Sequence, residues 1–148
     1  MDSGTSQFIV WKPEYSVGDD ALDLQHRKMF DIINKLYSQM RSGISNEEIH
    51  HQLEEVKTYA QKHFQTEEDA MRDCRYPDLE VHQRAHRKYE QDVQLLIRQR
   101  AQQAKALAHD LLSFLKKWWK EHVTNMDQRY APFLKRPNQA NKSDAGDS

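Results

Sequence analysis

Residues of the kind that bind metals occupy positions that helical periodicity assigns to a protein core. In four segments apolar residues recur at spacings of three and four, which is typical of amphipathic helices with one buried face. Seven positions on those faces hold imidazoles or carboxylates instead, namely His26, His63, Glu67, His82, His86, His122 and Asp127. A buried polar group without a partner costs several kcal/mol. The fold must therefore bring these side chains together around a group that can pair with all of them.

The four segments predict helices over residues 19–41, 46–73, 78–99 and 106–130. Gly43 is a suitable stop after the first helix, and Ser45 with Glu48 forms a capping box for the second. Pro77 suits the first turn of the third helix, whereas the break within 101–106 contains neither Gly nor Pro. Short connections make neighbouring helices antiparallel. We therefore predict an all-α fold, an up-down-up-down antiparallel four-helix bundle with an irregular N-terminal arm.

This topology places the seven polar residues at one end of the bundle. The start of the first helix, the end of the second, the start of the third and the end of the fourth all lie there, and each carries part of the set. The remaining histidines, His50, His51 and His109, are twelve or thirteen residues from His63 and His122, or about 18–20 Å along a helix. We expect them to be exposed at the opposite end.

Length and composition set the remaining bounds. The chain of 148 residues fits one domain, which we place at 8–136, between segments at 1–7 and 137–148 that we expect to be disordered. Lys and Arg number 22 against 23 acidic residues, so nucleic acid is a poor partner. The short apolar runs argue against stable membrane insertion. With the single Cys74 and no export signal, we expect a cytoplasmic monomer.

Five imidazoles and two carboxylates are too many donors for one metal ion and match two ions bridged by both carboxylates. His63 with Glu67 and His82 with His86 are four residues apart, so each pair shares a helix face. His122 and Asp127 are five apart, and either a fraying helix end or a π-bulge would bring them together. Iron, manganese, zinc and copper all accept such ligands. The ion with two histidines would keep one position open, which favours a small ligand such as O2.

These motifs resemble the hemerythrin family, in particular the single-domain bacteriohemerythrins. The resemblance spans 10–134 and rests on Trp11 and on residues 16–18, 22–26, 63–71, 76–77, 82–86, Trp118, 122–127 and Tyr130. It implies a non-haem di-iron centre with an oxo or hydroxo bridge and O2 as its ligand.

The resemblance also implies a role for each ligand. His82, His86 and His122 would hold the six-coordinate iron. His26 and His63 would hold the iron with the open position. Glu67 and Asp127 would bridge the two ions.

The function that follows is reversible O2 binding, for storage, transport or delivery to an O2-consuming enzyme. A histidine-rich set carries little anionic charge and should resist forming high-valent oxidants, and no substrate acid, base or nucleophile is evident, so we expect no enzymatic activity and no catalytic residues. The main alternative is sensing of O2, nitric oxide or redox state through a partner protein. Iron storage or repair and a structural zinc site are further alternatives.

One position departs from the family pattern. Members usually carry leucine three residues before the last histidine ligand, where it lines the O2 pocket, and this chain has Trp119 there. Overpacking a core pocket typically costs about 1–3 kcal/mol unless the ring points elsewhere. We expect Trp119 and Val123 to line the O2 pocket, with Trp119 restricting access to it.

Overall fold

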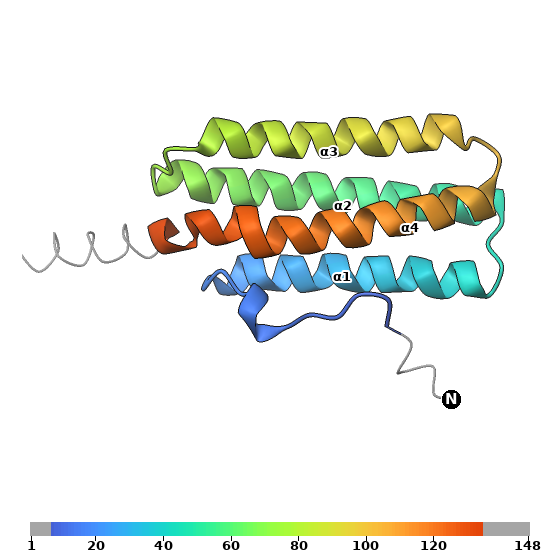
Figure 1. Cartoon of the computed structure of the whole chain (residues 1–148), viewed down its shortest axis with the longest axis horizontal. Coiled ribbons are helices and arrows are strands. Elements are labelled where there is room, and N and C mark those ends of the chain that lie inside the picture. Colours follow the sequence, from blue (N-terminus) through green and yellow to red (C-terminus); the bar gives the residue numbers. More distant parts are fainter. Residues whose placement is uncertain (1–6, 135–148) are drawn as a thin grey trace, which may run out of the picture.

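A computed structural model describes residues 7–134, so the expectations for 1–6 and 137–148 lie outside the described residues. Its four long helices are α1 (Asp20–Arg41), α2 (Asn46–Asp73), α3 (Leu79–Gln99) and α4 (Ala104–Glu121). They run in alternating directions along one axis and pack side by side as an antiparallel bundle (Figure 1). The predicted fold class is confirmed. Within 7–134, no helix is both long and apolar enough to cross a bilayer.

The signals that end α1 and begin α2 act as predicted. Gly43 follows α1 with a φ of +93°, a left-handed conformation that glycine adopts without strain. The Ser45 side chain accepts a hydrogen bond from the Glu48 amide, and the Glu48 carboxylate accepts one from the Ser45 amide. This reciprocal capping box fixes the start of α2.

The connection between α2 and α3 differs from the prediction. α2 ends in a Schellman motif, in which the Tyr76 amide donates to the Met71 carbonyl and the Arg75 amide to the Arg72 carbonyl. Arg75 takes the left-handed position at a φ of 56°, where glycine is usual. Pro77 therefore still belongs to the turn, and α3 begins only at Leu79, so placing Pro77 in the first helical turn was wrong.

The last helix is longer than predicted at both ends and contains an irregularity. α4 begins at Ala104, two residues before the predicted start. It passes into a π-helical segment, η3 (His122–Met126), and then continues as α-helix to residue 134, beyond the predicted end at 130. The helical turn after η3 carries Tyr130, which is fully buried and packs against Tyr76.

The hydrophobic core is divided into two parts by the polar layer. The larger cluster fills the body of the bundle with aliphatic and aromatic side chains from the arm, all four helices and η3. The smaller cluster lies one helical turn beyond the polar residues, toward the bundle end, and consists of Val17, Leu22, Met71, Tyr76 and Tyr130. The polar layer is thus covered by apolar side chains on both sides.

The N-terminal arm is attached to the bundle by hydrogen bonds with polar side chains of α1. The Asn34 side chain accepts from the Phe8 and Ile9 amides at 2.8 and 2.9 Å and donates to the Ile9 carbonyl at 2.9 Å. Farther along, after the short 3-10 helix η2 (Pro13–Tyr15), the Asp23 carboxylate accepts from the Val17 amide. The arm thereby holds the half-buried Trp11 ring 6.3 Å from that of His26.

We expect Asn34→Ala to release the start of the arm. Three hydrogen bonds to partly buried groups are lost, each worth about 0.5–1.5 kcal/mol, so the free energy of unfolding should fall by about 1–3 kcal/mol. Denaturant titration measures the loss, and amide exchange should localise it to Phe8 and Ile9. The control is Lys28→Ala, an exposed position on the same helix, which should change stability by less than about 0.5 kcal/mol. Equal stabilities for the two variants would show that the arm is held by other contacts.

Candidate metal centre

The structure brings all seven polar residues into one buried layer at one end of the bundle. None of them exposes more than 4% of its surface. Their donor atoms form two overlapping groups, and within each group the atoms lie within 4.8 Å of one another. One group is Glu67, His82, His86 and His122, and the other is His26, His63, Glu67 and Asp127.

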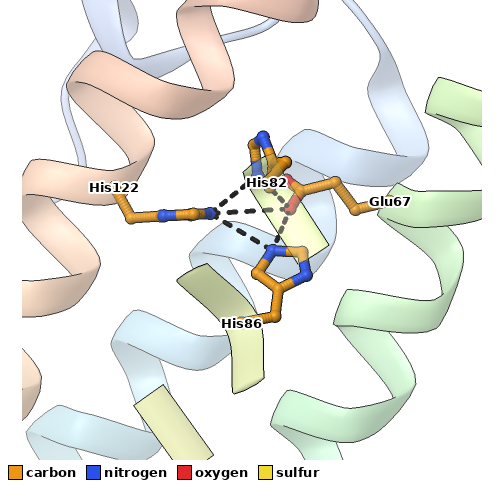
Figure 2. A group of neighbouring side chains, drawn as sticks. All are labelled: Glu67, His82, His86 and His122. Atoms are coloured by element: carbon orange, nitrogen blue, oxygen red, sulfur yellow. Dashed lines mark hydrogen bonds and ion pairs between the residues drawn. The ribbon is translucent and has the colours of Figure 1, made fainter. Parts of the chain in front are cut away.

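The three-histidine group converges on one oxygen of Glu67 (Figure 2). The Nε2 atoms of His82 and His86 lie 3.1 and 2.9 Å from Glu67 Oε1, and His122 Nε2 lies 3.7 Å from the same atom. The three nitrogens also approach each other, with 2.9 Å between those of His82 and His122. All three rings therefore present a nitrogen to one small volume.

The two-histidine group converges on the other oxygen of Glu67. The Nε2 atoms of His26 and His63 each lie 3.5 Å from Glu67 Oε2. Asp127 Oδ2 completes the group at 3.0 Å from His26 Nε2. This group contains one imidazole fewer than the first.

Both carboxylates span the two groups. Glu67 presents Oε1 to the first group and Oε2 to the second. Asp127 likewise places Oδ1 at 3.1 Å from the Nε2 atoms of His82 and His122, while Oδ2 faces His26. A carboxylate that bridges two ions must present one oxygen to each, and both side chains do so.

Hydrogen bonds within the layer do not satisfy all of its buried nitrogen and oxygen atoms. His26 Nε2 and both oxygens of Asp127 are buried without a hydrogen-bond partner among residues 7–134, although His26 and Asp127 approach within 3.0 Å. These atoms are close without pointing a hydrogen at one another. Cations between them would satisfy all of them at once. Imidazole with carboxylate suits transition metals, whereas Ca²⁺ and Mg²⁺ prefer oxygen ligands alone. The residues therefore fit a pair of transition-metal ions.

The π-helical segment η3 resolves how His122 and Asp127 share a face of the helix. The Asp127 amide donates to the His122 carbonyl, five residues earlier, in place of the usual four. In an α-helix a spacing of five would rotate Asp127 by about 140° from His122. The wider turn reduces that offset and brings both side chains onto one face of the helix. The π-bulge, one of the two possibilities that the sequence left open, is the one observed.

Further side chains orient the imidazoles and were not identified from the sequence. Glu68 Oε2 lies 2.7 Å from His86 Nδ1, and Gln25 Oε1 lies 2.8 Å from His63 Nδ1. Each acceptor places the ring proton on Nδ1 and leaves Nε2 free to bind a cation. Glu68 directly follows Glu67 and Gln25 directly precedes His26, but sequence alone gives no sign that either reaches a neighbouring helix.

The two imidazole partners differ in charge. His86 donates to a carboxylate, which makes its ring the more basic ligand, whereas His63 donates to a neutral amide. Tyr130 adds a third contact, since its buried hydroxyl donates to Glu67 Oε2 at 2.6 Å. The tyrosine therefore acts on the oxygen that faces the two-histidine group.

The electrostatics of the layer also favour cations. Burial opposes the ionisation of Glu67, yet the imidazoles around it hold its pKa well below the usual value. Burial likewise opposes protonation of His26, but its contacts with Asp127 and Glu67 raise its pKa to about 10. For the same reasons the pKa of His82 rises to about 9. Protons on His26 and His82 thus balance the negative charge of the carboxylates, and bound metal ions would displace these protons.

The structure also locates the other residues singled out from the sequence. Trp119 and Val123 are fully buried, and the Trp119 ring lies 5.7 Å from that of His63. His50, His51 and His109 are exposed, as expected.

The fold and the donor set define a class of protein, the histidine-rich metal-binding four-helix bundles. The family model of the Hemerythrin HHE cation binding domain matches residues 17–134. A bacteriohemerythrin of Clostridium acetobutylicum is 31% identical over 126 residues, which cover 82% of this chain and 98% of that protein. A hemerythrin-like protein of Naegleria gruberi is 28% identical, over 84% of this chain and 92% of that one. A crystal structure of a hemerythrin variant with leucine replaced by tyrosine aligns with a TM-score of 0.68 and 27% identity, over 86% of this chain and 98% of that one.

The chain belongs to the hemerythrin family. Its role is therefore metal binding connected with O2.

We expect Glu68→Ala to weaken metal binding by about 10–100-fold, because the change removes the anion that orients His86 and raises its basicity. Glu68→Gln keeps an oxygen acceptor but loses the charge, so its effect should be smaller. Competition with a chelator measures the affinity. Asp69→Ala is the matched control, since Asp69 is exposed one residue further on and pairs with two surface groups, Gln65 and Arg72. If both alanine variants bound metal equally, the Glu68 contact would have no part in ligation.

Proposed function

We propose that the seven residues bind two iron ions. His82, His86 and His122 would hold one ion, and His26 and His63 the other. Glu67 and Asp127 would bridge them together with an oxo or hydroxo group. The observation that supports this best is the geometry of the carboxylates, each with one oxygen toward each histidine group. Membership of a family of cation-binding domains supports it independently.

We further propose that the centre binds O2 reversibly, for storage, transport or delivery to an O2-consuming enzyme. A pair of ferrous ions would supply the two electrons that such binding needs. The two-histidine group has one donor fewer, so the open position would lie on its side, next to His63. Trp119, stacked on Phe64 at 5.5 Å, and the fully buried Val123 would line that side and exclude water. Without water to solvate an anion, bound O2 is less readily lost in a reduced, negatively charged form.

We propose no enzymatic activity. Within residues 7–134 the acids next to the layer already have hydrogen-bond partners. The Tyr130 hydroxyl is bound to Glu67, and Glu68 is bound to His86 and Gln83. None is left to transfer a proton to a substrate.

The iron count tests the ligand assignment. We expect two irons per chain in the wild type. His86→Ala should reduce the iron content and the stability together, because metal binding is coupled to folding. His109→Ala, which changes an exposed histidine at the far end of the bundle, should leave both unchanged. One iron per chain in the wild type, or zinc in its place, would refute the di-iron proposal.

The role of Trp119 is tested by Trp119→Leu. The indole fills the space beside His63, so we expect leucine to speed the association of O2 and azide while the iron content stays at two. The change also leaves the Tyr89 hydroxyl without its indole partner, so it is best made together with Tyr89→Phe. Stopped-flow mixing measures the rates, with Tyr89→Phe alone as the reference. Equal rates in the double and single variants would show that Trp119 does not limit access.

A further inference from the structure

An apolar cavity lies between α2 and α3, away from the polar layer and toward the middle of the bundle. Its volume is about 250 Å³. The inner wall consists of Leu53, Val56, Ala60, Tyr89 and Val93, all of them at most 8% exposed. The outer rim is polar and includes Glu54, Lys57 and Glu90.

The chemistry of the inner wall limits what the cavity can hold. Its one polar group, the Tyr89 hydroxyl, accepts a hydrogen bond from the Trp119 indole at 3.1 Å. An ion would find no partner there, and a buried water needs about two to four polar partners. Enclosed apolar cavities of about 150 Å³ stay dry and bind xenon or benzene. This cavity opens to solvent at its polar rim, but its inner wall is equally apolar. This cavity therefore suits a small, uncharged, apolar molecule.

A thin aromatic partition separates the cavity from the two-histidine group. Tyr89 contacts Phe64 with ring centroids 5.4 Å apart and Trp119 at 5.5 Å. Trp119 in turn lies 5.7 Å from the His63 ring. A molecule in the cavity is thus two side chains, Tyr89 and Trp119, away from the proposed open position. The hydrogen bond between those two holds the partition closed.

We propose that this cavity is an access site for O2, which collects there and passes to the His63 side when the Tyr89 and Trp119 rings move apart. The inference rests on the proposed O2-binding function. An access site changes the rates at which a ligand arrives and leaves without changing the affinity, since it does not contact the bound ligand. Narrowing the cavity should slow both rates equally, and loosening the partition should speed both equally.

Two variants narrow the cavity from opposite walls. Ala60→Leu adds bulk on α2 and Val93→Phe adds it on α3, so a folding defect in one leaves the other as a test. The matched control is Leu95→Phe, which enlarges a 46% exposed side chain of α3 that does not line the cavity. Tyr89→Phe removes the hydroxyl that holds Trp119 and loosens the partition.

The iron-loaded full chain is examined in two ways. Xenon, detected in pressurised crystals, should occupy the cavity in the wild type and in Leu95→Phe and be absent from Ala60→Leu and Val93→Phe. Flash photolysis or stopped flow should show O2 association and dissociation slowed by about tenfold in the two narrowing variants, and accelerated in Tyr89→Phe, at constant affinity.

The outcomes separate this inference from the function on which it rests. Xenon missing from the wild-type cavity, or O2 rates unchanged in a narrowing variant that excludes xenon, would overturn the access site while leaving reversible O2 binding intact. A changed O2 affinity with unchanged rates of arrival would overturn it as well. A wild-type protein that holds iron but binds no O2 would refute the proposed function itself.

Discussion

The structure depends on the burial of two carboxylates and five imidazoles in a single layer. Glu67 and Asp127 are both fully buried, and an unneutralised carboxylate in such surroundings is far too costly to persist. Protons on His26 and His82 can balance the charge, and the raised pKa values of these two histidines reflect this. These protons cannot also give every donor atom a directed partner, and within the described part of the chain both oxygens of Asp127 lack hydrogen bonds. Metal ions would both balance the charge and give each donor atom a partner. This requirement fixes how the four helix ends are arranged.

Much of the surrounding structure positions these donors. The smaller hydrophobic cluster closes the bundle end over the layer, and the arm adds Trp11 beside His26. Glu68 and Gln25 orient one imidazole in each histidine group, and they do so with different charge. The anionic partner belongs to the three-histidine group and the neutral one to the two-histidine group. The two proposed ions would therefore differ in the basicity of their ligands as well as in number of donors.

The bundle topology could be predicted because each helix carries its own periodic signal and the connections are short. The capping box at Ser45 and the left-handed Gly43 are local features, so they were also readable from the sequence. The errors occur where a residue acts outside its usual preference. Arg75 takes a left-handed position that glycine normally occupies, and this moved the start of α3 past Pro77. Contacts between helices, such as Glu68 with His86, depend on side-chain reach and could not be seen in one chain's pattern.

The distinction between local signals and contacts between helices also explains how the bundle accommodates Trp119. Considered alone, a tryptophan where the family usually has leucine predicts overpacking or a ring that turns outward. The ring does not turn outward, because the indole is fully buried, stacks on Phe64 and donates to the Tyr89 hydroxyl. A buried indole needs such an acceptor, and Tyr89 lies on a different helix, 30 residues away in sequence. The substitution therefore changes the protein at two places at once. It fills space beside His63, and it links that space to the cavity between α2 and α3 through a hydrogen bond that leucine could not make.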